Sequence, residues 1–153
     1  VGSEMCIRDR AIFIAMFISP KLAAVVCLGT TLGFFMTTPV IIALRAASHI
    51  CFALLGAVLI RKIPEIIEKP LPSTVFNGGL AFVHALAEVA VVSPFFLAGS
   101  IFKPEQLADG YVMSVLVLVG VGTFLHSLID YTVSIMLWKP VRAALPSLAE
   151  LRE

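Results

Sequence analysis

Apolar residues fill three long blocks of the chain, at residues 11–60, 73–102 and 110–138. Together these blocks make up 109 of the 153 positions. They contain four charged residues: Lys21, Arg45, Glu88 and Asp130. Each block is longer than the roughly 20 apolar residues that a helix needs to cross a bilayer. The pattern therefore predicts an all-α fold, a polytopic transmembrane helical bundle.

Proline-containing interruptions divide the first two blocks into spans. The first span is interrupted at Ser19-Pro20-Lys21 and ends at Thr37-Thr38-Pro39, because proline disfavours helix in the residue before it. A polar, proline-rich connection follows the second span at residues 61–72. The three predicted spans are residues 11–36, 40–60 and 74–98.

The last block admits two interpretations. Its 29 residues would extend about 43 Å as one helix, against a hydrocarbon core of about 30 Å. A reversal at Gly120 and Gly122 would instead give two short spans, 111–119 and 123–138, and five helices in total. Charge counting favours one long span, because the 61–72 loop and the 139–153 tail each carry three Lys or Arg residues, whereas residues 103–109 carry one.

Composition agrees with a membrane protein and excludes several other classes. Hydrophobic residues make up 59% and charged residues 14% of the chain, with a mean hydropathy of +1.03; soluble domains average about 45–50% and about 25%. The net charge of +1 makes nucleic-acid binding improbable. Three cysteines without CxxC or Cys/His spacing support neither a disulfide framework nor structural zinc. No GxxxxGK[ST] loop occurs, so any ATP that drives transport must be hydrolysed by another chain.

The first ten residues, VGSEMCIRDR, form a polar strip that matches neither a signal peptide nor a helix pattern. The strip resembles translated read-through of a sequencing adapter. We therefore expect residues 1–10 to be an artefact, with natural sequence missing upstream of Ala11, and we exclude Cys6, Arg8, Asp9 and Arg10 from the predicted site. The alternative is a genuine cytosolic leader.

Three pairs of polar residues lie inside the apolar segments at spacing i and i+4, which places each pair on one helix face. The pairs are Arg45 with His49, His84 with Glu88, and His126 with Asp130. A charge at the centre of a membrane helix costs about 2.5–3.5 kcal/mol on insertion scales, so it usually faces a partner or a cavity. These six residues are the candidate substrate-binding site.

Several chemistries are compatible with these pairs. The histidines and carboxylates could simply satisfy one another by hydrogen bonding, and Arg45 could snorkel to the headgroups. Metal binding is also compatible, although zinc and di-iron helices usually use HExxH or ExxH spacing. A ligand pocket explains the mixture of groups best, with aromatic residues as its walls. The candidate wall residues are Phe82, Phe95, Phe96, Phe124 and Tyr131.

Four sequence runs resemble the substrate-binding S component of an energy-coupling factor vitamin transporter. They are AMFISPKLAAVVCLGTTLGFF, GAVLIRK, NGGLAFVHALAEVAVVSPFF and GTFLHSLIDYTVSIMLWKPV, within residues 11–142. Such proteins often have Gly-Pro where this chain has Ser19-Pro20. The resemblance implies a single transmembrane domain at 11–142, with five helices here of the family's six, because the first helix is absent.

The resemblance also sets the expected topology. It implies that the last block folds as two helices, that the 61–72 loop lies outside, and that residues 143–153 form a cytosolic tail. The pocket would open to the outside of a bacterial cytoplasmic membrane. It would be built by His84 and Glu88 on the fourth helix of the family and by His126 and Asp130 on the sixth, with Arg45 and His49 on the third.

By this resemblance the protein is not an enzyme and needs no cofactor or metal. It captures a small vitamin-like molecule and then docks on a transmembrane coupling protein driven by two ATPase subunits. Niacin or another small aromatic acid is the expected substrate, because Arg45, the histidines and the nearby aromatic residues suit a planar anion. The alternatives are another small transporter or channel subunit, a membrane-embedded metal-dependent hydrolase, and a structural membrane protein.

Overall fold

The computed structural model describes residues 2–99 and 104–144, which are almost entirely helical and contain no β-strand. The long helices are α1 (Gly2–Ile18), α2 (Pro20–Thr37), α3 (Val40–Lys62), α5 (Pro70–Leu97) and a π-helix, η1 (Val112–Val121), which continues as α7 (Gly122–Ala144). Two short helices, α4 (Glu65–Glu68) and α6 (Pro104–Ala108), lie in the connections. The predicted all-α fold is confirmed.

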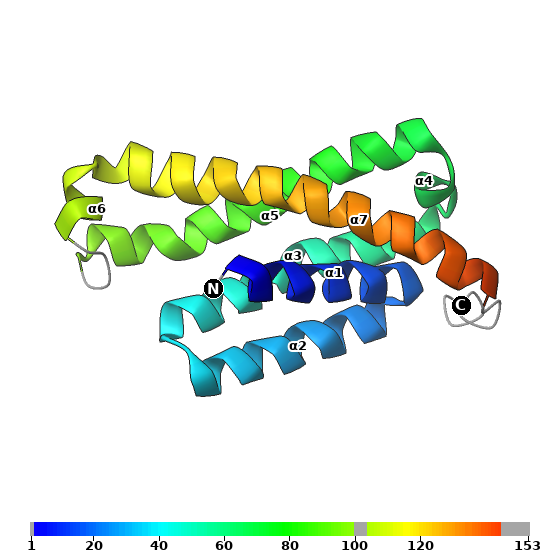
Figure 1. The fold of residues 1–153 in the computed structure, drawn as a ribbon, viewed down its shortest axis with the longest axis horizontal. Helices are drawn as coiled ribbons and strands as arrows, with labels where there is room; N and C mark the ends of the chain where they lie inside the picture. The colour runs from blue at the N-terminus through cyan, green and yellow to red at the C-terminus, as the bar shows by residue number, and fades with distance from the viewer. Residues whose placement is uncertain (1, 100–103, 145–153) are drawn as a thin grey trace.

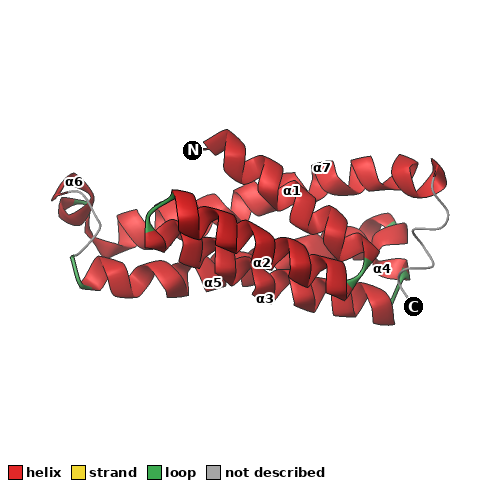
Figure 2. Cartoon of the chain, turned by 90° about the horizontal axis from the view of Figure 1, so that it is seen from below, coloured by secondary structure: helices red, strands yellow, loops and turns green. Residues whose placement is uncertain are grey.

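Four helical segments are long and apolar enough to cross a membrane: Pro20–Thr37, Val40–Lys62, Pro70–Leu97 and Val112–Ala144. Their connections gather at two ends of the bundle, with α6 at one end and α4 at the other (Figures 1 and 2). We call the end with α4 the basic end, because α2 begins there, α3 and α7 end there, and these termini carry lysine and arginine. The residues are Lys21, Arg61, Lys62, Lys69, Lys139 and Arg142. The chain is a multi-pass membrane protein, as predicted.

The first predicted span, residues 11–36, forms parts of two helices rather than one interrupted helix. The break is at Ser19, whose extended backbone (φ −163°) ends α1 and whose hydroxyl accepts a hydrogen bond from the Leu22 amide at 3.1 Å. Pro20 occupies the first turn of α2, where its missing N–H leaves no hydrogen bond unmade. An N-cap and a first-turn proline together start a new helix where the sequence interpretation placed an interruption within one span.

Helix α1 begins at Gly2, so residues 2–10 are helical although no helix pattern was recognised in them. Their polar character misled the interpretation because Arg8 and Asp9 face the bundle interior, where they pair with each other and with histidines. The assignment of residues 1–10 to adapter read-through stays a prediction.

The last apolar block is one continuous helical segment, so the prediction of two short spans is wrong. Residues Val112–Ala144 run on through Gly120 and Gly122, and Gly122 has ordinary helical dihedrals (φ −58°, ψ −49°). Glycine permits a reversal but does not require one, and no other turn-forming residue accompanies it here. The π-helical part has i→i+5 hydrogen bonds, which place more residues in each turn than an α-helix does.

The continuous last segment brings the 61–72 loop to the same end of the bundle as the carboxyl end of α7. Arg142 on α7 donates to Glu68 on α4 over 3.0 Å, and Figure 1 shows α4 beside the end of α7. The 61–72 loop and the end of α7 thus lie at one end of the bundle rather than at opposite ends, which agrees with the single long span that charge counting favours. Most of the predicted tail, residues 145–153, lies outside the described residues.

The main hydrophobic core lies where α1 packs against α3 and α7 in the half of the bundle nearer the basic end. Its aromatic rings pack against one another in tilted and edge-on pairs. The ring centroids of Phe13 and Phe52 lie 5.3 Å apart, those of Phe17 and Tyr131 5.6 Å, and those of Phe17 and Trp138 6.2 Å. A second, smaller cluster lies toward the α6 end and contains Val92, Phe96 and Val115. The buried polar residues occupy the space between these two apolar layers.

Small residues allow the helices to approach closely inside the bundle. A side chain at Gly56 of α3 would overlap Met16 of α1 and approach Leu80 of α5 to 3.2 Å. Ala53, Ala57 and Ala81 are likewise buried. The Gly29-x-x-x-Gly33 pair of α2 differs, because nothing lies within 4 Å of either position. The small-residue pattern therefore serves internal packing in α3 and α5.

Candidate functional site

The six predicted residues lie in one buried polar region contributed by α3, α5 and α7. Arg45 and His49 come from α3, and His84 and Glu88 come from α5; these four contact one another. His126 and Asp130 come from α7 and form a second group. The i, i+4 spacing holds within each helix, but most of the contacts join different helices, which the spacing could not predict.

Arg45 and Glu88 form an ion pair that links α3 to α5. The Nε and Nη2 groups of Arg45 both donate to Oε2 of Glu88, at 2.7 and 2.5 Å. The glutamate side chain is 1% exposed, whereas that of Arg45 is 25% exposed. Arg45 thus turns inward to a carboxylate rather than toward the lipid headgroups, and the snorkelling alternative is wrong.

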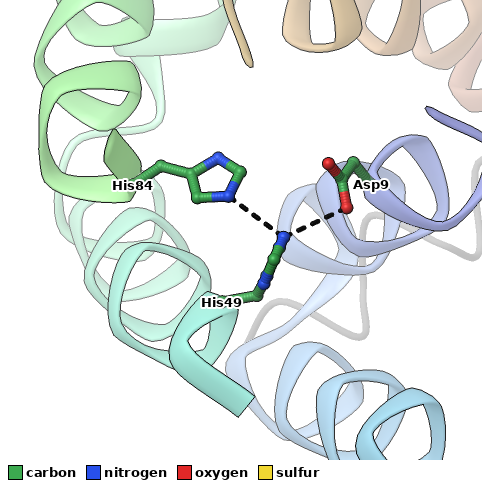
Figure 3. Close-up of side chains that lie close together, drawn as sticks. All are labelled: Asp9, His49 and His84. Carbon is green, nitrogen blue, oxygen red and sulfur yellow. Dashed lines mark hydrogen bonds and ion pairs between the residues drawn. The ribbon is translucent and has the colours of Figure 1, made fainter. Parts of the chain in front are cut away.

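The two histidines of α3 and α5 meet through their Nε2 atoms, which lie 3.0 Å apart. Figure 3 shows both rings directed at this point between the helices. Nδ1 of His49 lies 2.6 Å from the Arg45 carbonyl oxygen, so Nδ1 carries the proton and donates it to that oxygen. The Nε2 lone pair of His49 is therefore directed at His84.

On α7 the predicted pair also forms. His126 Nε2 lies 2.8 Å from Asp130 Oδ2, the contact that the i, i+4 spacing predicts. Asp130 is 1% exposed and His126 28% exposed at the side chain. His126 and Arg45 are thus the members of the predicted set through which solvent or a ligand reaches the buried groups.

Helix α1 contributes residues that the sequence interpretation had excluded. Asp9 lies between the two groups, with Oδ1 3.2 Å from His49 Nε2 and Oδ2 3.0 Å from His126 Nε2. Arg8 donates to Asp9 at 2.9 Å and also approaches His49 Nε2 at 2.9 Å. Arg10 donates to Asp130 at 2.9 Å. Nothing in the strip itself distinguished these residues from a solvated charge run.

Two further residues of the site were missed. Thr123 of α7 donates to Oε2 of Glu88 at 3.3 Å, so this helix also reaches the α3–α5 group. Phe52 packs against both imidazoles, with ring centroids 5.6 Å from His49 and 4.4 Å from His84. A threonine and a phenylalanine in apolar helices carry no chemical signal in the sequence.

The aromatic residues that were predicted to line the pocket do not surround the buried histidines. Tyr131 packs in the main core and its hydroxyl is hydrogen-bonded to Ser73 at 2.9 Å. Phe96 belongs to the second apolar cluster. Phe82 and Phe124 line an apolar groove of about 400 Å³ between α5 and the η1–α7 segment, away from the histidines. Phe95 is only partly buried.

Among the described residues, the polar region is balanced in charge. Three carboxylates face three guanidinium groups, and this pairing offsets the cost of burying them. The six are Asp9, Glu88, Asp130, Arg8, Arg10 and Arg45. Such a site can bind a small polar molecule or a metal ion by exchanging one of these internal contacts for a contact to the ligand.

Comparison with known proteins supplies one relative. The chain is 35% identical over 133 residues to the niacin transporter NiaX of Lactococcus lactis subsp. cremoris. The match covers 86% of this chain and 58% of the relative, so the chain spans somewhat more than half of the relative's length. No family model and no solved structure matches the chain. The match confirms the resemblance to a vitamin transporter that the sequence runs indicated.

Proposed function

We propose that the chain is the substrate-capture subunit of an energy-coupling factor importer and that its substrate is niacin. The similarity to the niacin transporter carries this proposal. A match that covers 86% of the chain necessarily includes α3, α5 and the first part of α7, which hold the six predicted residues. The six predicted residues therefore lie within the part of the chain that matches the relative. The role is binding and reorientation, not catalysis.

The chemistry of the region suits nicotinate, a planar anion with a carboxylate and a ring nitrogen. Arg45 is partly exposed and its guanidinium already holds a carboxylate, that of Glu88. A substrate carboxylate would accept charge-assisted hydrogen bonds from the other N–H groups of the same guanidinium. His126, the other partly exposed member, holds its Nε2 against Asp9 and Asp130, and its N–H would reach the pyridine nitrogen by exchanging the contact to Asp9. Glu88 and Asp130 then act as positioning residues for these two groups.

The distribution of charge supports an orientation. Lysine and arginine concentrate at the basic end, which the positive-inside rule assigns to the cytoplasm. Arg45 lies only five residues after the start of α3, at the opposite end. The polar region would therefore open toward the outside of the bacterial cytoplasmic membrane, as capture requires.

Partner subunits complete the proposal. The 153-residue sequence contains no nucleotide-binding loop of the GxxxxGK[ST] type, so ATP that drives import would be hydrolysed by other chains. We assign this role to a transmembrane coupling protein and two ATPase subunits. The exposed apolar face of α2, which includes Leu28, Leu32 and Phe35, is suited to the surrounding lipid.

The proposal is tested by measuring nicotinate binding to the full chain in lipid nanodiscs. We expect nicotinate to bind more tightly than nicotinamide, which lacks the carboxylate, and benzoate, which lacks the ring nitrogen. Arg45→Lys should weaken binding about tenfold or more, because lysine cannot reproduce the guanidinium geometry. Arg142→Lys is the matched control, since its ion pair lies at the basic end. Folded protein that binds no nicotinate, or equal losses in both variants, would contradict the proposal.

A further inference from the structure

We propose that His49, His84 and Glu88 form a binding site for a first-row divalent cation, with Zn²⁺ the best match. The site uses the Nε2 atoms of both histidines and the Oε1 atom of the glutamate. It goes beyond niacin capture and does not depend on it, although the two share residues.

The distances between the three atoms match those of a metal site. The two Nε2 atoms lie 3.0 Å apart, and Oε1 of Glu88 lies 3.9 Å from His49 Nε2 and 3.8 Å from His84 Nε2. A point equidistant from three atoms so placed is about 2.1 Å from each of them, which is the length of Zn–N and Zn–O bonds. One ion at this point would reach all three ligands without movement of the helices.

Arg45 orients two of the ligands. Its carbonyl oxygen accepts the Nδ1 proton of His49, which leaves the Nε2 lone pair for a metal. Its guanidinium holds Oε2 of Glu88, which leaves Oε1 directed at the histidines. Metal-binding histidines and carboxylates are typically held in this way by a hydrogen bond from their other polar atom.

The ligand set and its burial favour a transition metal. Two imidazoles and one carboxylate suit zinc and its neighbours better than Mg²⁺ or Ca²⁺, which prefer oxygen ligands. The three side chains are at most 1% exposed, so water competes weakly for the ion. His49 on α3 is 35 positions from His84 and 39 positions from Glu88, which both lie on α5. This separation explains why the ligands form no HExxH or ExxH motif in the sequence.

Zinc usually has four ligands, so three protein ligands leave one position open. Asp9 is close, because its carboxylate falls within 4.8 Å of both histidine nitrogens. Arg8 also contacts His49 Nε2, and metal binding would replace that contact. The proposed site rests on the ligands of α3 and α5, and the fourth position is filled by Asp9, water or an anion.

The test measures zinc in the full chain, purified in detergent through a tag without histidine. The protein is treated with a chelator, reloaded with Zn²⁺, and assayed by inductively coupled plasma mass spectrometry and by competition with a fluorescent chelator. We expect one equivalent of zinc. His84→Ala and Glu88→Gln should each weaken binding about tenfold or more. Glu65→Gln, an exposed matched control, should leave binding unchanged.

The variants also decide the ligand set. Asp9→Asn should retain zinc within about threefold, and Co²⁺ substituted for Zn²⁺ should give visible bands that Glu88→Gln alters. Folded protein without stoichiometric zinc would overturn the proposal, as would loss of zinc in Asp9→Asn together with its retention in Glu88→Gln. Size-exclusion elution and the fluorescence of Trp138 report whether each variant is folded. Nicotinate binding to the zinc-free protein separates this proposal from the preceding one, because either can fail alone.

Discussion

Removal of the Arg45 side chain should destabilise the bundle through the carboxylate that it leaves behind. Glu88 is 1% exposed and receives two donors from Arg45 and one from Thr123. Breaking a buried ion pair by removing one partner costs about 3–5 kcal/mol. Arg45 is 25% exposed, so water reaches the gap and the lower limit applies. We therefore expect Arg45→Met to lower the free energy of unfolding by about 3 kcal/mol.

A double-mutant cycle tests the cause of this loss. Glu88→Gln leaves a neutral amide that Thr123 still contacts, so it should cost about 1 kcal/mol. The combined variant Arg45→Met with Glu88→Gln should be nearly as stable as Glu88→Gln alone, because no buried charge remains unpaired. Reversible unfolding in mixed SDS micelles supplies all four free energies. The reasoning is refuted if Arg45→Met costs under about 1 kcal/mol or if the two effects simply add.

Three other predictions follow from the packing and the topology. Gly56→Leu should lower the free energy of unfolding by about 1–3 kcal/mol through overpacking, whereas Gly29→Leu should change it little, as comparative thermal unfolding will reveal. Ser19→Ala should cost about 1 kcal/mol by removing the N-cap of α2, and an unchanged unfolding midpoint would argue against the cap. A cysteine at Glu65 should react with an impermeant maleimide only in inverted vesicles, and one at Asp109 only in intact cells; the reverse pattern would overturn the orientation.

Much of the bundle follows from the sequence because apolar blocks with proline stops specify membrane helices. Pro39 separates α2 from α3, and residues 63–69, within the predicted 61–72 connection, separate α3 from α5. The incorrect predictions of helix boundaries occur where one sequence motif is compatible with two backbone structures. Ser19-Pro20 marks either a kink or a new helix, and Gly120 with Gly122 permits either a turn or a continuous helix. Packing partners in the folded chain, which local sequence does not show, decide between them.

Six members of the buried polar region were predictable from the sequence, but its other members and most of its contacts were not. Buried charges in membrane helices are rare enough that Arg45, Glu88 and Asp130 stand out by residue type alone. Their partners could not be derived, because Arg45 and Glu88 meet across 43 positions of the chain. The metal triangle depends on the same long-range contacts. The contribution of α1 was excluded by an argument about the origin of residues 1–10, which the fold does not address.

The charge balance of the polar region has an electrical consequence. Moving one elementary charge across a membrane potential of 100 mV requires about 2.3 kcal/mol. The charges of the three carboxylates and the three guanidinium groups cancel, so a shift of these six groups along the membrane normal does almost no electrical work. Under the proposed function, a bound nicotinate adds one negative charge. With the cytoplasm negative, inward movement of the loaded region would then run against the membrane voltage, and the rate of import should fall as that voltage rises.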